Sequence, residues 1–205
     1  MTYRVVLATA NPDKARELRA VLATAGLDLE LVPRPGEVAE VEETGATLLD
    51  NARLKAKALG AATGMPTLAD DTGLEVDALD GAPGVRSARY AGDNATYEDN
   101  VVRLLRDLAV RPDRPRTARF VTVVVLSSPD GSEVIAQGQV EGVIADAPRG
   151  GNGFGYDPVF VPEGGGRTFA EMAPGEKDAI SHRGRALRDL AARLRESGWP
   201  TNEER

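Results

Sequence analysis

The sequence predicts an α/β protein with a mixed β-sheet flanked by helices. Short apolar runs alternate with helical segments, and one pair of long β-rich runs is joined by a hairpin turn. The chain has 205 residues, enough to bury a full core within a single domain that spans 1–205. With 41% hydrophobic and 28% charged residues, its composition is that of an ordinary globular protein.

The N-terminal segment predicts a buried strand followed at once by a helix. Residues Tyr3 to Thr9 (YRVVLAT) are apolar and rich in β-branched side chains. Asn11 can cap a helix that has Pro12 in its first turn, and Gly26 is expected to end it. The turn therefore lies at a helix N-terminus, where the orphan N–H groups and the helix dipole favour an anion.

Further strands and helices follow in alternation. A short strand is expected over 29–32, and helices are expected over 48–62 and 97–108. Thr47 and Asp50 form a capping box at the start of the first of these helices. Strands that alternate with helices in this way favour parallel pairing.

The clearest β signal lies between residues 116 and 145. Two long β-rich runs are joined there by SPDGS, whose Asp-Gly pair is typical of a hairpin turn. We therefore expect antiparallel strands beside the parallel ones. A glycine-rich loop and a short strand follow, and a helix over 181–196 ends the pattern. Its buried stripe is expected to consist of Leu187, Leu190, Ala191 and Leu194.

Composition excludes several classes of function. A net charge of −7 argues against general binding of DNA or RNA, which requires a basic face, although a small anionic ligand remains possible. The absence of any run of about 18 apolar residues excludes a membrane span. Without a leader-like N-terminus, a cytoplasmic location is expected. Zero cysteines and one histidine exclude disulfides, thiol nucleophiles and multi-histidine metal centres.

Two acidic pairs are candidates for metal ligands. Asp70 and Asp71 lie in MPTLADDTGLEVDAL, where we expect a strand that ends at the two aspartates, a usual place for an α/β active site. Adjacent carboxylates repel unless a cation neutralises them, and Mg²⁺ prefers oxygen ligands. Glu42 and Glu43 form the second pair, in a loop. Either pair could instead be an ordinary solvated turn, and spacing alone does not decide.

Two other segments could bind a nucleotide. TANPDK offers a capped helix start with Lys14, although it lacks the glycines of a Walker A sequence and most such turns are ordinary caps. In GGNGFGYDP, glycines surround Phe154, which could stack on a base while Asp157 accepts a hydrogen bond from its edge. Equally, Phe154 could lie in the core and Asp157 could cap a turn.

The only histidine is His182, which lies beside Arg183 in the first turn of the last expected helix. Ser181 is a good N-cap for this helix. Basic residues are unfavourable near the positive end of the dipole, so a bound negative or carbonyl-bearing group would explain them. A lone histidine is more often a surface or core residue, but Lys177 nearby favours a binding role.

Taken together, these segments resemble the Ham1-like inosine triphosphate pyrophosphatase family. The match runs along nearly the whole chain in order, through LATANPDKARELRAVL, EETGATLLDNARLKAKAL, LADDTGLEVDALDGAPGVRSARYAG, GFGYDPVF and EKDAISHRGRAL. The resemblance implies an elongated α/β subunit of two lobes with a central cleft, commonly a homodimer. The tail with Trp199 could be a dimer contact or a frayed end.

The resemblance also implies an activity. Members hydrolyse ITP, dITP and XTP to the monophosphate and pyrophosphate with Mg²⁺, which removes deaminated purine nucleotides from the pool. Asp71 looks like the general base, and Glu42 or Glu43 with Asp70 and Asp71 would hold the metal. Substrate contacts are implied for Thr9, Asn11, Lys14, Thr72, Phe154, Gly155, Tyr156, Asp157, Lys177, His182 and Arg183. One departure is Ala10, where many relatives have glycine.

The implied substrates fit a simple account of specificity. Hypoxanthine and xanthine carry a 6-oxo acceptor and an N1–H donor, so Arg183 or Lys177 could meet the oxygen while Asp157 accepts from N1. Adenine presents the opposite pattern and would leave both partners unpaired in a buried site. Guanine shares the 6-oxo group, and nothing in the sequence shows what excludes it.

Three other functions compete with this one. A Maf-like pyrophosphatase of related fold would act on modified pyrimidine or standard nucleotides, but GFGYDPVF and ISHR count against it. A nucleotide-binding sensor would bind the same ligands without turnover, and the intact acidic residues argue for catalysis instead. A receiver-type signalling domain would carry its acidic pair after the first strand, whereas here the pair follows a later one.

Overall fold

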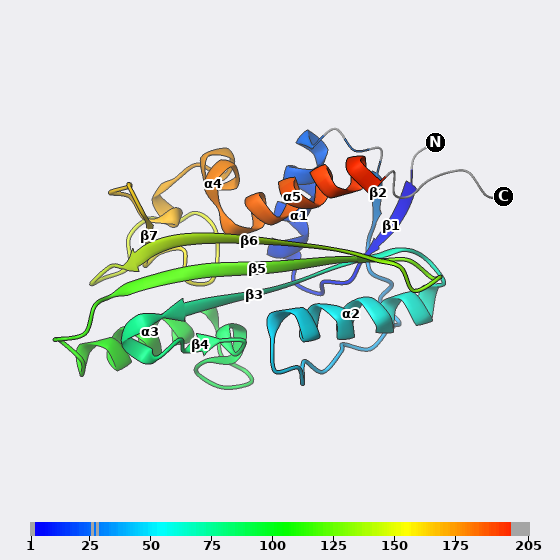
Figure 1. Cartoon of the computed structure of the whole chain (residues 1–205). Helices are drawn as coiled ribbons and strands as arrows, with labels where there is room; N and C mark the ends of the chain where they lie inside the picture. The colour runs from blue at the N-terminus through cyan, green and yellow to red at the C-terminus, as the bar shows by residue number, and fades with distance from the viewer. Residues whose placement is uncertain (1–2, 26, 28, 198–205) are drawn as a thin grey trace. The chain divides into compact units, whose positions relative to one another are not determined.

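The computed structural model describes residues 3–25, 27 and 29–197 (Figure 1). Gly26, predicted to end the first helix, and the tail with Trp199 lie outside these residues. The chain divides into two compact units. Unit 1 comprises Met1–Asp71, Thr122–Gly138 and Arg183–Arg205, and unit 2 comprises Thr72–Val121 and Gln139–His182.

The elements confirm the predicted α/β class with a mixed sheet. The helices are α1 (Pro12–Thr24), α2 (Leu48–Thr63), α3 (Tyr97–Ala109), α4 (Pro174–Ile180) and α5 (His182–Ser197). The strands are β1 (Tyr3–Leu7), β2 (Leu29–Val32), β3 (Thr67–Val76), β4 (Pro83–Gly84), β5 (Thr117–Ser127), β6 (Glu133–Ile144) and β7 (Phe160–Pro162). β3, β5 and β6 each contribute one part to unit 1 and one part to unit 2. In the described residues, no helix is long and apolar enough to span a membrane.

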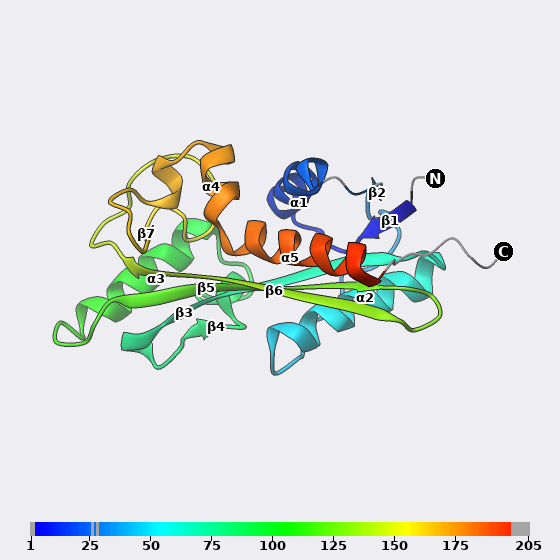
Figure 2. The same ribbon diagram turned by 45° about the horizontal axis from the view of Figure 1, so that its top comes forward.

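Unit 1 is built on parallel strands. Its strands follow the order β2-β1-β3-β5-β6, and β1 runs parallel to both of its neighbours. α1 and the part of α5 in this unit cover one face of the strands, and α2 covers the other (Figures 1 and 2). In sheets of this kind, ligands bind outside the carboxyl ends of the strands.

The core of unit 1 lies between the helices α1 and α5 and the strands. Leu18 of α1 and Leu187 of α5 are fully buried there. The predicted stripe of α5 is confirmed, since Leu187, Leu190, Ala191 and Leu194 are all buried. α2 packs on the opposite face through small side chains, among them Ala52 and Ala56.

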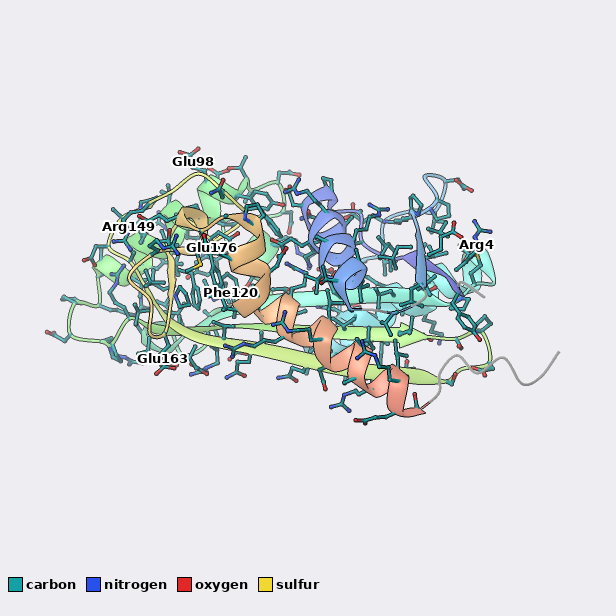
Figure 3. All side chains as sticks on the ribbon, turned by 90° about the horizontal axis from the view of Figure 1, so that it is seen from above. Arg4, Glu98, Phe120, Arg149, Glu163 and Glu176 are labelled. Atoms are coloured by element: carbon teal, nitrogen blue, oxygen red, sulfur yellow. The ribbon has the colours of Figure 1, made fainter. Side chains whose placement is uncertain are left out.

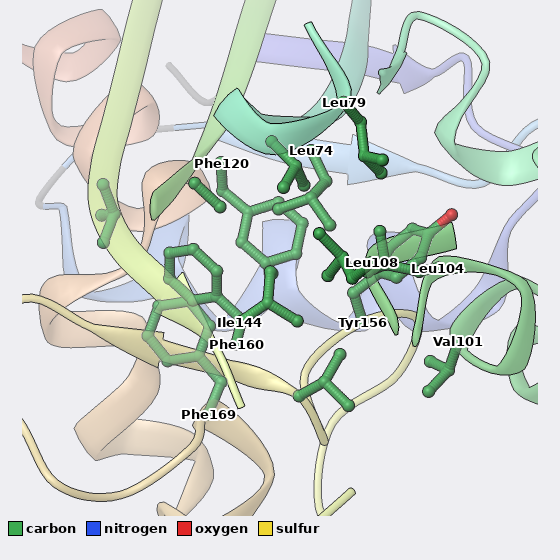
Figure 4. Packing of buried hydrophobic residues seen from close by; sticks show 14 of the residues in the cluster. Leu74, Leu79, Val101, Leu104, Leu108, Phe120, Ile144, Tyr156, Phe160 and Phe169 are labelled. Atoms are coloured by element: carbon green, nitrogen blue, oxygen red, sulfur yellow. The ribbon is translucent and has the colours of Figure 1, made fainter. Parts of the chain in front are cut away.

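Unit 2 combines antiparallel pairs with an aromatic core. β3 pairs with β4 and β6 pairs with β7, both antiparallel. The amphipathic helix α3 buries Val101, Leu104 and Leu108. These side chains pack in one cluster with Phe120, Phe160 and Phe169 (Figure 4). The glycine-rich segment between β3 and α3 contains β4 and a short 3₁₀ helix, Ser87–Arg89.

The helix starts follow local rules and were predictable. The side chain of Asn11 accepts from the backbone N–H groups of Asp13 and Lys14, as an N-cap should. Thr47 and Asp50 form the expected capping box of α2. The end of α2 is an αL cap at Gly64, which has φ of 66° and donates its backbone N–H to the Gly60 carbonyl at 2.8 Å.

The predicted end of β3 at the two aspartates was wrong. β3 continues for five more residues to Val76, so Asp70 and Asp71 lie within the strand. In this extension Thr72 and Glu75 are partly exposed, whereas Leu74 and Val76 are fully buried. The first strand is in turn shorter than predicted, because β1 ends at Leu7.

Candidate functional site

The turn between β1 and α1 carries the predicted phosphate contacts of unit 1. The backbone N–H of Asn11 donates to Thr9 Oγ1 at 3.1 Å, which fixes the turn. Asn11 Oδ1 in turn accepts from two N–H groups of α1, so the cap itself satisfies these donors. An anion at this helix start would therefore be stabilised mainly by the side chain of Lys14 and the helix dipole, and less by backbone N–H groups.

A pocket of about 400 Å³ opens in unit 1 at the carboxyl ends of β1 and β2. Thr9, Ala10 and Pro12 form one wall, and the loop after β2, including Arg34, forms the other. Ala10, the departure noted in the sequence, therefore places its methyl group at a pocket wall. Arg34 closes the loop by donating to the backbone carbonyls of Val38 and Ala39.

Asp70 is buried in an ionic network on the side of the sheet that faces α1 and α5. Its Oδ2 lies 3.6 Å from Lys14 Nζ and 3.3 Å from Arg183 Nη2. Arg183 also donates to Glu17 of α1, one turn after Lys14. Burial alone would raise the pKa of Asp70, but the Lys14 and Arg183 charges lower it to about 2. Asp70 is therefore ionised at neutral pH.

Asp71 has a different set of partners, all from α2 and the loop before it. Lys55 Nζ lies 3.0 Å from Asp71 Oδ1 and 2.8 Å from Glu43 Oε1, so one ammonium bridges two carboxylates. Asn51 Nδ2 donates to Asp71 Oδ2 at 3.3 Å. Burial raises the pKa of Asp71, and the Lys55 charge only partly offsets this.

The two adjacent aspartates have separate hydrogen-bond and ion-pair partners. Successive side chains of a strand point to opposite faces, so Asp70 meets α1 and α5 while Asp71 meets α2. Lys14 and Arg183 accompany Asp70, and Lys55 accompanies Asp71. Carboxyl groups whose pKa values are pushed apart in this way are typical of an acid-base site.

The arrangement of carboxylates fits Mg²⁺ bound together with a substrate. Among the described residues there is no group of three or more His, Asp or Glu side chains that could hold a metal ion alone. Glu43 and Asp71 nevertheless converge on the one ammonium of Lys55. Mg²⁺ commonly uses one or two carboxylates and completes its shell with water and substrate phosphates. Glu42, in contrast, has an exposed side chain.

Unit 2 holds the predicted base contacts around one buried ion pair. Asp157 Oδ2 lies 2.5 Å from Lys177 Nζ and also accepts from the backbone N–H of Phe154 at 2.9 Å. The ammonium lies 5.0 Å from the centre of the Phe154 ring, and Tyr97 of α3 contacts the same ring at 5.6 Å. We call Tyr97, Phe154, Asp157 and Lys177 the aromatic site of unit 2.

Glycines allow the loop to close around Asp157. Gly153 has φ of 71°, and a Cβ built there would lie 2.0 Å from Asp157 Oδ2. Any larger residue would displace the carboxylate and with it the backbone of Phe154. Gly155 also takes a positive φ, of 64°. The sequence prediction that these glycines free the backbone around Phe154 is consistent with this geometry.

Tyr156 and His182 are core residues of unit 2. The Tyr156 hydroxyl donates to the backbone carbonyl of Ser87 at 2.9 Å, and its side chain packs in the hydrophobic cluster. His182 is 3% exposed and stacks on Phe120 with ring centres 4.4 Å apart. Figure 3 labels Phe120 near the turn between α4 and α5, where His182 begins α5.

The structure thus sorts the predicted residues into two groups. Unit 1 gathers Thr9, Asn11, Lys14, Glu43, Asp70, Asp71 and Arg183, and Glu42 lies in the same loop as Glu43. Unit 2 contains Thr72, Phe154, Gly155, Tyr156, Asp157, Lys177 and His182. Arg183 was grouped with His182 from the sequence, yet its guanidinium is engaged with Asp70 and Glu17.

Sequence reasoning missed several members of the two groups. Lys55 and Asn51 are four residues apart, so they share one face of α2, but only the packing of that helix on β3 shows that the face meets Asp71. Glu17 lies one turn after Lys14, a spacing that could have suggested a shared face. Tyr97 lies at the start of α3, and nothing in the sequence indicates its contact with Phe154.

Comparison with known proteins places this geometry in a family. A model of the Ham1 family matches residues 5–193. The chain is 49% identical over 195 residues to a dITP/XTP pyrophosphatase of Streptomyces coelicolor, covering 94% of this chain and 98% of that protein. A dITP/XTP pyrophosphatase of Thermus thermophilus is 52% identical over 187 residues, covering 91% and 89% of the two chains.

Solved structures show the same similarity. A HAM1 protein from Coxiella burnetii has a TM-score of 0.86 at 43% identity, covering 95% of this chain and all 100% of that one. A nucleoside-triphosphatase, or dITP/XTP pyrophosphatase, from Mycobacterium abscessus has a TM-score of 0.72 at 49% identity, covering 90% and 95%. On the strength of matches along almost its whole length, the chain belongs to the Ham1 family.

Proposed function

We propose that this protein hydrolyses the bond between the α- and β-phosphates of ITP, dITP and XTP, releasing the nucleoside monophosphate and pyrophosphate. The observation that carries the proposal is the placement of the two adjacent carboxylates in different charged surroundings, Asp70 beside Lys14 and Arg183 and Asp71 beside Lys55. Relatives about 50% identical to this chain are dITP/XTP pyrophosphatases, which supports the same reaction here.

Asp71 is the general base of the proposed reaction. It accepts a proton from the attacking water as the water oxygen bonds to phosphorus and the bridging oxygen leaves with pyrophosphate. A raised pKa brings a carboxylate closer to the pH at which it works, which suits proton transfer. Lys55 holds one oxygen of Asp71 and keeps the carboxylate in place.

Cationic side chains of unit 1 bind the triphosphate. Lys14 is half-buried at the start of α1, beside the predicted contacts Thr9 and Asn11. Burial lowers the pKa of Lys14, and the Asp70 charge only partly offsets this. A phosphate oxygen near this ammonium would favour its charged form, so Lys14 can stabilise the charge that develops on the leaving pyrophosphate.

Glu43 and Asp71 would hold Mg²⁺. Glu43 is chosen over Glu42 because Glu43 and Asp71 both contact the Lys55 ammonium, whereas Glu42 is exposed. When bound, Mg²⁺ neutralises phosphate charge and lowers the pKa of the attacking water. The proposal places Asp70 in the ion pairs with Lys14 and Arg183 rather than on the metal.

The aromatic site of unit 2 recognises the base. Phe154 supplies the stacking surface, and Lys177 is a donor within reach of a 6-oxo group of a purine stacked there. Asp157 holds both Phe154 and Lys177 in position. A 6-amino group of adenine would face the ammonium donor to donor, so ATP and dATP are disfavoured. We further propose a homodimer, on the sequence resemblance alone, and a cytoplasmic location.

The proposal is tested by a substrate panel. We expect release of pyrophosphate and monophosphate from ITP, dITP and XTP with Mg²⁺, much slower turnover of dATP, dGTP and dTTP, and loss of turnover with EDTA. Binding of ITP without turnover would instead indicate a nucleotide sensor. Preferred turnover of pyrimidine or standard nucleotides would contradict the role given to the aromatic site.

A further inference from the structure

Asn51 is the uncharged side chain among the charged groups around Asp71. It lies in the first turns of α2 and is 1% exposed. Its Nδ2 donates to Asp71 Oδ2 at 3.3 Å, and its Oδ1 accepts from the backbone N–H of Gly45 at 2.8 Å. A buried amide is stable only when both of its ends find partners, and here each end holds a different part of unit 1.

Gly45 belongs to the loop that carries Glu42 and Glu43. A Cβ built on Gly45 would lie 2.6 Å from Asn51 Oδ1, closer than real side-chain contacts allow. Only glycine therefore lets this loop approach Asn51 closely enough for the hydrogen bond. Asn51 thus ties the backbone two residues after Glu43 directly to the carboxylate of Asp71.

Lys55 makes a second link between the same two parts. One turn after Asn51 on the same face of α2, its ammonium joins Glu43 Oε1 and Asp71 Oδ1. A divalent cation held by Glu43 and Asp71 would compete with this ammonium for the same oxygens. The side-chain amide of Asn51 is uncharged, so a bound cation repels it less than it repels the Lys55 ammonium.

We propose that Asn51 is a positioning residue, which keeps the Glu43 loop and Asp71 in register when a cation and substrate bind. This inference rests on the proposed function, in which Asp71 is the base and Glu43 a metal ligand. Mutation of residues that hydrogen-bond to metal ligands and orient them commonly lowers metal affinity or activity by about 10- to 100-fold. Asn51 has the geometry of such a group, because one end of its amide contacts the Glu43 loop and the other contacts Asp71.

Unit 2 offers a matched control in Asn100. Both asparagines directly follow a capping box, in TLLDN for α2 and TYEDN for α3. Asn100 is 2% exposed, its Oδ1 accepts from the backbone N–H of Ala91 at 2.7 Å, and its Nδ2 donates to the backbone carbonyl of Ala88 at 3.1 Å. It clamps a loop as Asn51 does, but its amide donates to a carbonyl rather than to a carboxylate.

The test compares Asn51→Ala, Asn51→Asp and Asn100→Ala with the wild type. We measure kcat and KM for ITP, the Kd of Mn²⁺ by electron paramagnetic resonance without nucleotide, and the thermal midpoint. Asn51→Asp keeps an oxygen for Gly45 but loses the donor to Asp71. Both Asn51 variants should lower kcat by about 10-fold or more, and Asn51→Ala should also raise the Kd of Mn²⁺ by about 10-fold or more. Asn100→Ala should keep both values within about twofold despite a lowered thermal midpoint.

Two results would overturn the inference. One is a wild-type kcat and Mn²⁺ affinity in Asn51→Asp. This variant is used alone if Asn51→Ala does not fold. The other is an equal loss of kcat in the Asn51 and Asn100 variants, which would reduce Asn51 to a loop clamp of ordinary kind. Failure of the proposed function is separate, because it would appear as a wild-type protein that does not hydrolyse ITP.

Discussion

Unit 1 and unit 2 both bury charged side chains, but they stabilise them differently. Around Asp70 and Asp71 in unit 1, Lys14, Lys55 and Arg183 supply several positive charges within one network. In unit 2, the Lys177–Asp157 pair is surrounded by aromatic rings, with Lys177 Nζ 5.0 Å from the centre of Phe154 and 5.7 Å from that of Phe169.

This difference separates two tasks of one enzyme. A network of opposite charges can move the pKa values of its members in opposite directions, as it does for Asp70 and Asp71. A single ion pair between aromatic rings instead presents a fixed donor beside a stacking surface. Unit 1 is therefore suited to proton transfer and phosphate binding, and unit 2 to recognition of a flat base.

The largest expected effect comes from removing the charge at Asp70. Asp70→Asn leaves Lys14 and Arg183 buried with less compensating charge, so we expect a loss of about 3–5 kcal/mol in the free energy of unfolding. Asp189→Asn in α5 is the control, because its pair with Arg193 is largely exposed and should contribute about 0–1 kcal/mol. Chemical denaturation of both variants measures the difference, and equal losses would contradict the account.

Asp70 should also make the free energy of unfolding depend on pH in the acidic range. Its pKa is lowered to about 2 in the folded protein, so the stabilisation is present above the usual pKa of 3.8 and is lost as the pH falls towards 2. The wild type should therefore lose more stability than Asp70→Asn over this range. Parallel curves for the two proteins would show that the network does not hold Asp70 ionised.

A smaller effect is expected in unit 2 from Phe154→Ala. Stacking of a base on an aromatic side chain contributes about 1–3 kcal/mol, so KM for ITP should rise by about 5- to 150-fold. Because Phe154 is assigned to recognition, kcat at saturation should change little. Phe154→Tyr is the control and should stay near the wild type. A fall in kcat without a change in KM would break the separation of tasks.

The smallest effect concerns Tyr90, whose hydroxyl donates to Asp107 at 2.7 Å in unit 2. Burial, aided by Asp107, raises the pKa of Tyr90 to about 12. The stabilisation is thus present below the usual pKa of 10 and is lost as the pH rises towards 12. Tyr90→Phe should cost about 1 kcal/mol at neutral pH, and the difference from the wild type should shrink above pH 10. A constant difference would refute this.

Local features of the fold could be predicted from the sequence. The caps at Asn11 and Thr47 depend on side chains within three residues, and both were found as expected. The stripe of α5 depends only on helical spacing, and it is buried. The extent of β3 could not be predicted, because charged Asp70 and Asp71 are tolerated within a strand only where distant lysines and arginines compensate them.

The candidate site was predicted by residue type more than by partner. The resemblance pointed to Asp71, to Glu42 or Glu43 and to Lys177, but the sequence contained no sign that Lys55 joins Asp71 and Glu43. Likewise, Arg183 follows His182 in the chain, yet it is engaged with Asp70 and Glu17. Such partners depend on which faces of two elements meet, and a single sequence does not specify this.

The most direct test of the separation of tasks is a comparison of turnover and product binding in Asp71→Asn. We predict that kcat for ITP falls by about 10²- to 10⁴-fold, as expected for loss of a general base, while the Kd of inosine monophosphate stays within about twofold. A variant that still hydrolyses ITP at nearly the wild-type rate would contradict the role of Asp71. Equal losses of turnover and of monophosphate binding would contradict the division between the charged groups of unit 1 and the aromatic site of unit 2.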